Sequence, residues 1–143
     1  MATRGIQLLK LSFVIGTIAD AIVAANWFLI AAGAEIPNML AGMVGAGADY
    51  RFAMYIAALF MTGWTVIFAW GWFNPVERRG LLLITAALLL LSMVLEVALY
   101  SSTLGGAGFV LGLSARAALI AKFSFSYFYS RSGEGNVVVQ EAR

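Results

Sequence analysis

The chain has 143 residues, of which 62% are hydrophobic and 11% are charged, with a formal net charge of +2 and a mean hydropathy of +0.91. This composition lies outside the range of soluble globular domains and inside that of integral membrane proteins. We therefore expect the lipid bilayer to be the main partner of the chain, and we expect no nucleic-acid partner.

The chain contains no cysteine and no histidine. Disulfides, thiolate metal sites, iron–sulfur clusters and bis-histidine haem ligation are therefore excluded. The sequence predicts no metal site, no cofactor and no catalytic residue, and we expect that the protein is not an enzyme.

Four long apolar runs dominate the sequence. A helix needs about 20 apolar residues to cross a bilayer core, and these runs are apolar on every face rather than alternating as in a barrel strand. They predict transmembrane helices over about 8–32, 52–73, 81–100 and 106–129. Because the second and third breaks are short, we expect one domain, residues 1–129, folded as an all-α antiparallel up-down bundle.

Basic residues predict the orientation of this bundle. Six of them fall at three places that share one side: before the first helix, in the turn after the second, and after the fourth (Arg4, Lys10, Arg78, Arg79, Arg131 and Arg143). Arg51 is the single basic residue expected on the other side. The sequence thus predicts a multi-pass protein of the cytoplasmic (inner) or cell membrane, with both termini cytoplasmic and Arg78 and Arg79 determining topology.

The first predicted helix carries a charge in the membrane. Asp20 lies ten residues after Lys10, or about 15 Å along a helix, which is near the midplane. Gly16, Asp20 and Ala24 are spaced by four residues, so the carboxylate lies on a stripe of small residues that permits close helix packing. Asn26, in the same helix, is expected to form an interhelical hydrogen bond.

The connection over 33–49 is mostly apolar and rich in glycine. It admits two interpretations: a re-entrant, pore-lining element, or a short helix from about Pro37 on the outer surface followed by a flexible turn. We favour the surface helix.

The third predicted helix contains Glu96, about fifteen residues from its start and so in the outer third of the bilayer. Arg51, at the outer start of the second helix, is the cation we expect to pair with it. Such a shared, partly solvated partner makes Glu96 the acid that we expect to exchange protons if the protein moves ions.

The fourth predicted helix carries Arg116 at a depth similar to that of Asp20, on a stripe with Gly108 and Gly112. A charge at the centre of a spanning helix costs about 2.5–3.5 kcal/mol, so both ions should face the protein interior. We expect Asp20 and Arg116 to pair, as a structural pin in the first interpretation and as part of a transport or gating path in the second. The polar residues 130–143, with Gly133 and Gly135 as helix breakers, are expected to form a mobile cytoplasmic tail.

Two hypotheses for function remain open. The first is a non-catalytic accessory, assembly or interaction component of the membrane, favoured by short loops and few intramembrane polar groups. The second is a small-solute or ion transporter or channel that uses the intramembrane acids. The expected protein partner is either a second copy of the chain or another membrane protein.

Overall fold

The computed structural model describes residues 3–100 and 104–141 and is all-helical apart from its connections. Its helices are α1 (Thr3–Ala31), α2 (Ala48–Phe73), α3 (Gly80–Tyr100) and α4 (Gly106–Glu141). Within the described residues, four helices are long and apolar enough to cross a membrane. The prediction of four spanning helices is confirmed, with boundaries that differ by a few residues at most of the ends.

The end of α4 is the largest difference from the predicted boundaries. The helix continues to Glu141, through Gly133 and Gly135, where the sequence predicted a break and a tail over 130–143. An interior glycine costs about 1 kcal/mol relative to alanine, but it creates no clash, and a helix that has already formed elongates easily. Two isolated glycines are therefore insufficient to end this helix.

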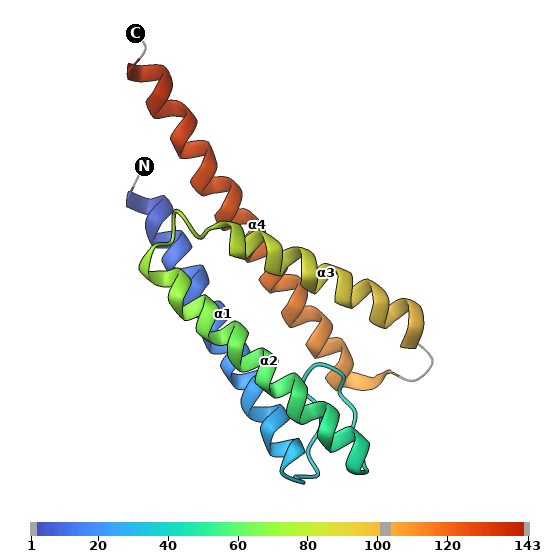
Figure 1. The fold of residues 1–143 in the computed structure, drawn as a ribbon. Coiled ribbons are helices and arrows are strands. Elements are labelled where there is room, and N and C mark those ends of the chain that lie inside the picture. The colour runs from blue at the N-terminus through green and yellow to red at the C-terminus, as the bar shows by residue number, and fades with distance from the viewer. Residues whose placement is uncertain (1–2, 101–103, 142–143) are drawn as a thin grey trace.

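The helices form two pairs. α1 packs along α2 and α3 packs along α4, and a further contact joins α1 to α4. α2 and α3 follow each other through the short turn over 74–79 but then diverge (Figure 1). We call the end of the molecule that carries this turn the turn end, and the opposite end, which carries the connection over 32–47, the loop end.

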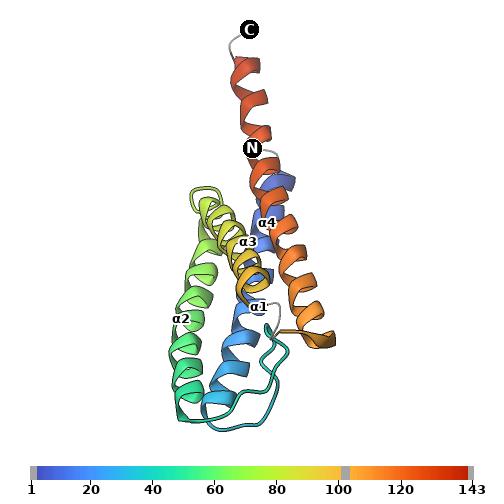
Figure 2. The same ribbon diagram turned by 90° about the vertical axis from the view of Figure 1, so that its right-hand side faces the viewer.

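The start of α1 and the last residues of α4 both lie toward the turn end (Figures 1 and 2). The first residues of α2 and of α4 lie toward the loop end in the same views. The two helix pairs are therefore joined most closely at the turn end and are open toward the loop end on the side of α2 and α3.

An aromatic core holds the turn end together. Its buried side chains come from all four helices (Leu9, Phe13, Phe68, Leu82, Ala86 and Phe123). Phe68 of α2 occupies the centre, with its ring centroid 5.7 Å from that of Phe13 and 5.5 Å from that of Phe123. Trp64 packs against this cluster from one side.

Two glycines make room for these rings. A Cβ atom at Gly16 would collide with the ring of Phe68, and one at Gly71 would collide with the ring of Phe13. In each of α1 and α2, a glycine thus packs against a phenylalanine ring of the other helix. Gly16 was expected to permit close helix packing, and its face receives mainly the ring of Phe68 from α2.

Small polar residues make the contact between α1 and α4. Ser12 and Ser126 share a buried hydrogen bond of 2.7 Å between their hydroxyl oxygens. A Cβ atom at Gly5 would lie 3.8 Å from the Cα atom of Ser130, so the two backbones approach closely there. Serine and glycine at such an interface are typical of helix packing in membranes.

Large apolar side chains cover the outside of the bundle. Phe60, Leu99 and Leu111 are 77%, 65% and 71% exposed, and many other leucine, valine and phenylalanine side chains are half exposed. An apolar surface of this extent is unfavourable in water but is matched by lipid chains. The surface therefore agrees with a multi-pass membrane protein.

Candidate functional site

A cleft with a volume of about 590 Å³ opens between α2 and α3, and side chains of both helices line it. Its walls come from all four helices and from the connection over 32–47, and most of its lining is apolar (Trp27, Ala57, Phe60, Met61, Trp64, Leu88 and Leu89 among others). Three ionisable side chains also line it: Asp20, Glu96 and Arg116. The smaller pockets beside Phe28 and Arg51 and beside Thr17 and Trp72 bring together no such group of charges.

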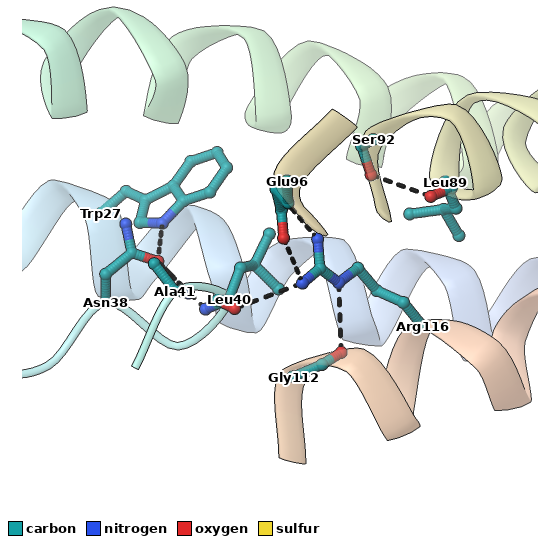
Figure 3. Close-up of polar contacts among 9 residues, drawn as sticks. All are labelled: Trp27, Asn38, Leu40, Ala41, Leu89, Ser92, Glu96, Gly112 and Arg116. Carbon is teal, nitrogen blue, oxygen red and sulfur yellow. Dashed lines mark hydrogen bonds and ion pairs between the residues drawn. The ribbon is translucent and has the colours of Figure 1, made fainter. Parts of the chain in front are cut away.

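Arg116 and Glu96 form a two-pronged ion pair in the cleft. The Nη1 atom of Arg116 donates to Oε1 of Glu96 at 2.6 Å, and its Nη2 atom donates to Oε2 at 2.7 Å (Figure 3). The guanidinium is 3% exposed, whereas Glu96 is 26% exposed. Paired, parallel hydrogen bonds of this kind are the strongest arrangement available to arginine and a carboxylate.

Arg116 also binds two backbone carbonyls. Its Nε atom donates to the carbonyl of Gly112 at 3.1 Å, and its Nη2 atom donates to the carbonyl of Leu40 at 3.3 Å. The side chain therefore joins α4, α3 and the connection over 32–47. The ion pair thus lies beside the connection at the loop end.

The sequence predicted other partners for these charges, and both expectations are wrong. Arg116 was expected to pair with Asp20, and Glu96 with Arg51. Side chains on a helix point toward its N-terminus. The guanidinium on α4 therefore lies about one turn nearer the loop end than its Cα atom, which the bond to the Gly112 carbonyl shows directly. Asp20 on α1 is displaced in the opposite direction, toward the turn end, and so the two ions separate.

Asp20 consequently lacks the expected cation. Its Oδ2 atom is buried and has no hydrogen-bond partner among the described residues. The side chain lines the cleft near the middle of α1, seventeen residues after Thr3. Glu96, by contrast, has both oxygens engaged, so the premise on which we expected it to be the proton-exchanging acid is wrong.

The connection over 32–47 is irregular and folds inward. No helix forms from Pro37, so the favoured interpretation as a surface helix is wrong. Asn38 organises the segment: its Oδ1 atom accepts hydrogen bonds from Nε1 of Trp27 at 3.2 Å and from the backbone N–H of Leu40 at 3.0 Å and of Ala41 at 3.3 Å (Figure 3).

Asn26 of α1 holds the same segment from the other side. Its Nδ2 atom donates to the carbonyl of Pro37 at 3.1 Å, and its Oδ1 atom accepts from the N–H of Met39 at 3.1 Å. Asn26 was expected to bond to another helix, but it binds backbone groups of the connection instead. Two asparagines thus satisfy polar backbone that would otherwise be costly to bury.

Glycines let this connection lie directly on α4. Gly42 has a φ of +69°, which favours glycine, and a Cβ atom there would lie 2.5 Å from the backbone nitrogen of Phe109. A Cβ atom at Gly112 would lie 2.6 Å from the carbonyl oxygen of Leu40. Gly108 and Gly112 were expected to pack against another helix, but they receive the connection over 32–47.

The remaining predicted residues lie outside the cleft. Arg51 is exposed near the start of α2, with its guanidinium against Gly33 and beside a small pocket that Phe28 and Tyr55 also line. Arg78 lies in the turn at the turn end, where its Nη1 atom donates to the carbonyl of Trp70. Its guanidinium carbon stacks 3.3 Å from the centroid of the Trp70 ring. Arg79 follows it in the same turn, and the role of both residues in topology stays a prediction.

Sequence reasoning identified the three charged residues of the cleft but missed its other polar and aromatic members. Asn38 carried a signal, since an asparagine directly after Pro37 in an otherwise apolar segment favours a turn. Trp27 and Phe60 carried none, because aromatic residues in spanning helices contact lipid as often as protein.

Comparison with protein families, with curated proteins and with solved structures finds no match to this chain. The geometry of the cleft is therefore the feature from which a function can be inferred.

Proposed function

We propose that this chain is a non-catalytic interaction component of the cytoplasmic membrane and that its cleft binds a small apolar molecule from the bilayer. In this proposal the helices are antiparallel and both termini are cytoplasmic. The observation that carries this proposal is the cleft of about 590 Å³ between α2 and α3. Ligand sites in proteins typically enclose about 300–1,000 Å³ and are mostly apolar with a few polar groups. Phe60 lines this cleft and is also 77% exposed, which supports an opening toward lipid.

The state of the charged groups supports a binding role. Both oxygens of Glu96 accept hydrogen bonds from Arg116, and Arg116 also binds the carbonyls of Gly112 and Leu40. A general acid or base has to gain or lose a proton at the reacting atom, and a saturated ion pair resists this. We interpret the pair as a structural pin that shapes the cleft.

Photo-crosslinking tests the proposal. We place a photoreactive phenylalanine analogue at Phe60, in the cleft, and as a matched control at Leu111, which is 71% exposed on the outside of α4 and does not line the cleft. The expected result is a discrete adduct of defined mass at position 60 that is absent at position 111. The same mixture of bulk lipid adducts at both positions would contradict a selective guest.

Transport is the second candidate function, since Asp20 and the Glu96–Arg116 pair line one cavity. A path through so small a bundle would involve more than one copy of the chain. Proteoliposomes with an imposed ion or pH gradient test this candidate, with a cleft-filling Ala57→Trp variant as control. Flux in the wild-type protein that the variant abolishes would favour transport over a static binding role.

A further inference from the structure

We propose that the guest of this cleft is a small amphiphilic cation, an organic amine or onium ion whose positive centre pairs with Asp20 while its apolar body fills the space between α2 and α3. This inference rests on the proposed binding function and specifies the ligand class. It is carried by three observations: the unpartnered carboxylate oxygen, the size of the cleft, and the aromatic side chains around it.

The charge balance of the cleft selects a cation. Glu96 and Arg116 neutralise each other, and among the described residues Asp20 is the acid of the lining that no ion pair neutralises. Its Oδ2 atom is buried with no hydrogen-bond partner among the described residues. A carboxylate within a spanning helix is strongly disfavoured unless it is paired or protonated, so a positively charged guest gains binding energy by replacing the proton and supplying the missing partner.

Asp20 is the group of the lining that we expect the cation to contact, because the neighbouring polar side chains already form hydrogen bonds. Glu96 has no free carboxylate oxygen, since both accept from Arg116. The hydroxyl hydrogens of Thr85 and Ser92, which also line the cleft, are donated to carbonyls of their own helix. The lining therefore repels an anion at Asp20 and offers few other groups to a neutral polar guest.

An inorganic cation fits this lining poorly. Calcium and magnesium take six or more oxygen ligands in proteins. The cleft offers the carboxylate of Asp20 within walls that are otherwise mostly alanine, leucine, phenylalanine and tryptophan. A cation that carries its own apolar substituents matches both features of the site.

The volume of the cleft suits a small molecule. Cavities that bind drug-sized ligands enclose about 300–1,000 Å³. The cleft, at about 590 Å³, lies within that range. A lipid-soluble cation of drug size is the occupant that fits this space.

Aromatic rings complete the site. Trp27, Phe60 and Trp64 all line the cleft with Asp20. Faces of aromatic rings attract organic cations, and tryptophan does so most strongly. Since Trp64 also packs against the aromatic core at the turn end, one wall of the cleft is held rigid.

The test compares two ions of matched size and shape and opposite charge, tetraphenylphosphonium and tetraphenylborate. Binding to the full-length protein in nanodiscs of neutral lipid is measured by equilibrium dialysis, with empty nanodiscs subtracted. We expect the wild-type protein to bind the cation at least tenfold more tightly than the anion. This comparison needs no variant and so does not depend on the folding of an altered protein.

Three variants locate the binding. Asp20→Asn should lose the preference for the cation, and Ala57→Trp should weaken binding of the cation by filling the cleft. Asp49→Asn, which removes an exposed acid in the first turn of α2, should bind the cation like the wild type. The Asp20→Asn protein is first checked for unchanged helical circular dichroism, and Asp20→Glu should keep the preference.

The outcomes separate this inference from the proposed function. Equal binding of both ions, weakened by Ala57→Trp, would overturn the inference and leave the binding cleft in place. Absence of saturable binding of either ion would contradict both. A cation preference that survives Asp20→Asn but is lost in Asp49→Asn would overturn the assignment of the carboxylate.

Discussion

Loss of either partner of the Glu96–Arg116 ion pair should destabilise the fold, and loss of both should cost less than the sum of the two single losses. Glu96→Gln leaves a guanidinium that is 3% exposed without a counter-charge, and Arg116→Gln leaves a carboxylate that is 26% exposed. Removing one partner of a buried pair costs about 3–5 kcal/mol. We expect about 4 kcal/mol for Glu96→Gln and about 3 kcal/mol for Arg116→Gln within that range, because Glu96 has more access to its surroundings.

The double variant removes both charges and leaves two amides that can bond to each other. Its loss of unfolding free energy should therefore be smaller than the sum of the single losses by about 2–3 kcal/mol, which is the coupling energy of the pair. Reversible unfolding in mixed micelles with increasing sodium dodecyl sulfate, followed by tryptophan fluorescence, measures each value. A parallel cycle with Asp20→Asn and Arg116→Gln is the control.

Two results would refute this reasoning. One is additive losses for Glu96→Gln and Arg116→Gln, which would mean that the two charges do not stabilise each other. The other is a coupling between Asp20 and Arg116 as large as that between Glu96 and Arg116, since no ion pair joins Asp20 to Arg116 among the described residues.

Three further predictions follow from the packing and from the orientation. Gly16→Ala should lower the free energy of unfolding by about 1–3 kcal/mol, because the added methyl group meets the ring of Phe68. Gly63→Ala, with open space around its Cβ position, should be neutral or raise this free energy by up to about 1 kcal/mol. The same unfolding assay measures both, and equal costs would contradict the glycine–phenylalanine packing. Gly112→Ala should displace the Leu40 carbonyl and speed amide hydrogen exchange over 38–42, and unchanged exchange would show that the connection does not depend on this approach. In intact cells, Arg78→Cys should resist an impermeant thiol reagent while Ala46→Cys reacts, and the reverse pattern would invert the orientation.

The helices were predictable because hydrophobicity alone identifies a membrane span. Length and composition placed every helix boundary except the end of α4 within about five residues of its position in the structure. The start of α1 at Thr3 lies before the predicted start because the first turn of this helix is polar and hydropathy excludes it. The extension of α4 to Glu141 was missed because two glycines were given more weight than their cost in a formed helix justifies.

The charge pairing was not predictable from depth alone. Counting residues gave Asp20 and Arg116 similar depths, but the pairing depends on the direction of each side chain and on which helices are neighbours. α4 packs along α3, so Glu96 is within reach of Arg116. Gly108 and Gly112 correctly indicated a close backbone approach to α4. A periodic pattern on one helix does not indicate which segment approaches it, and here that segment is the connection over 32–47.

The bond between Arg116 and the Leu40 carbonyl also constrains how the protein is made. During synthesis the connection over 32–47 and the carboxylate of Glu96 enter the membrane before Arg116 exists, so each lacks its partner until the last helix arrives. Since only a short segment separates α3 from α4, the two can enter the bilayer together as a hairpin that carries no net charge at the pair. The connection over 32–47 therefore reaches its final conformation only after α4 has been made, although it precedes three of the four helices in the chain.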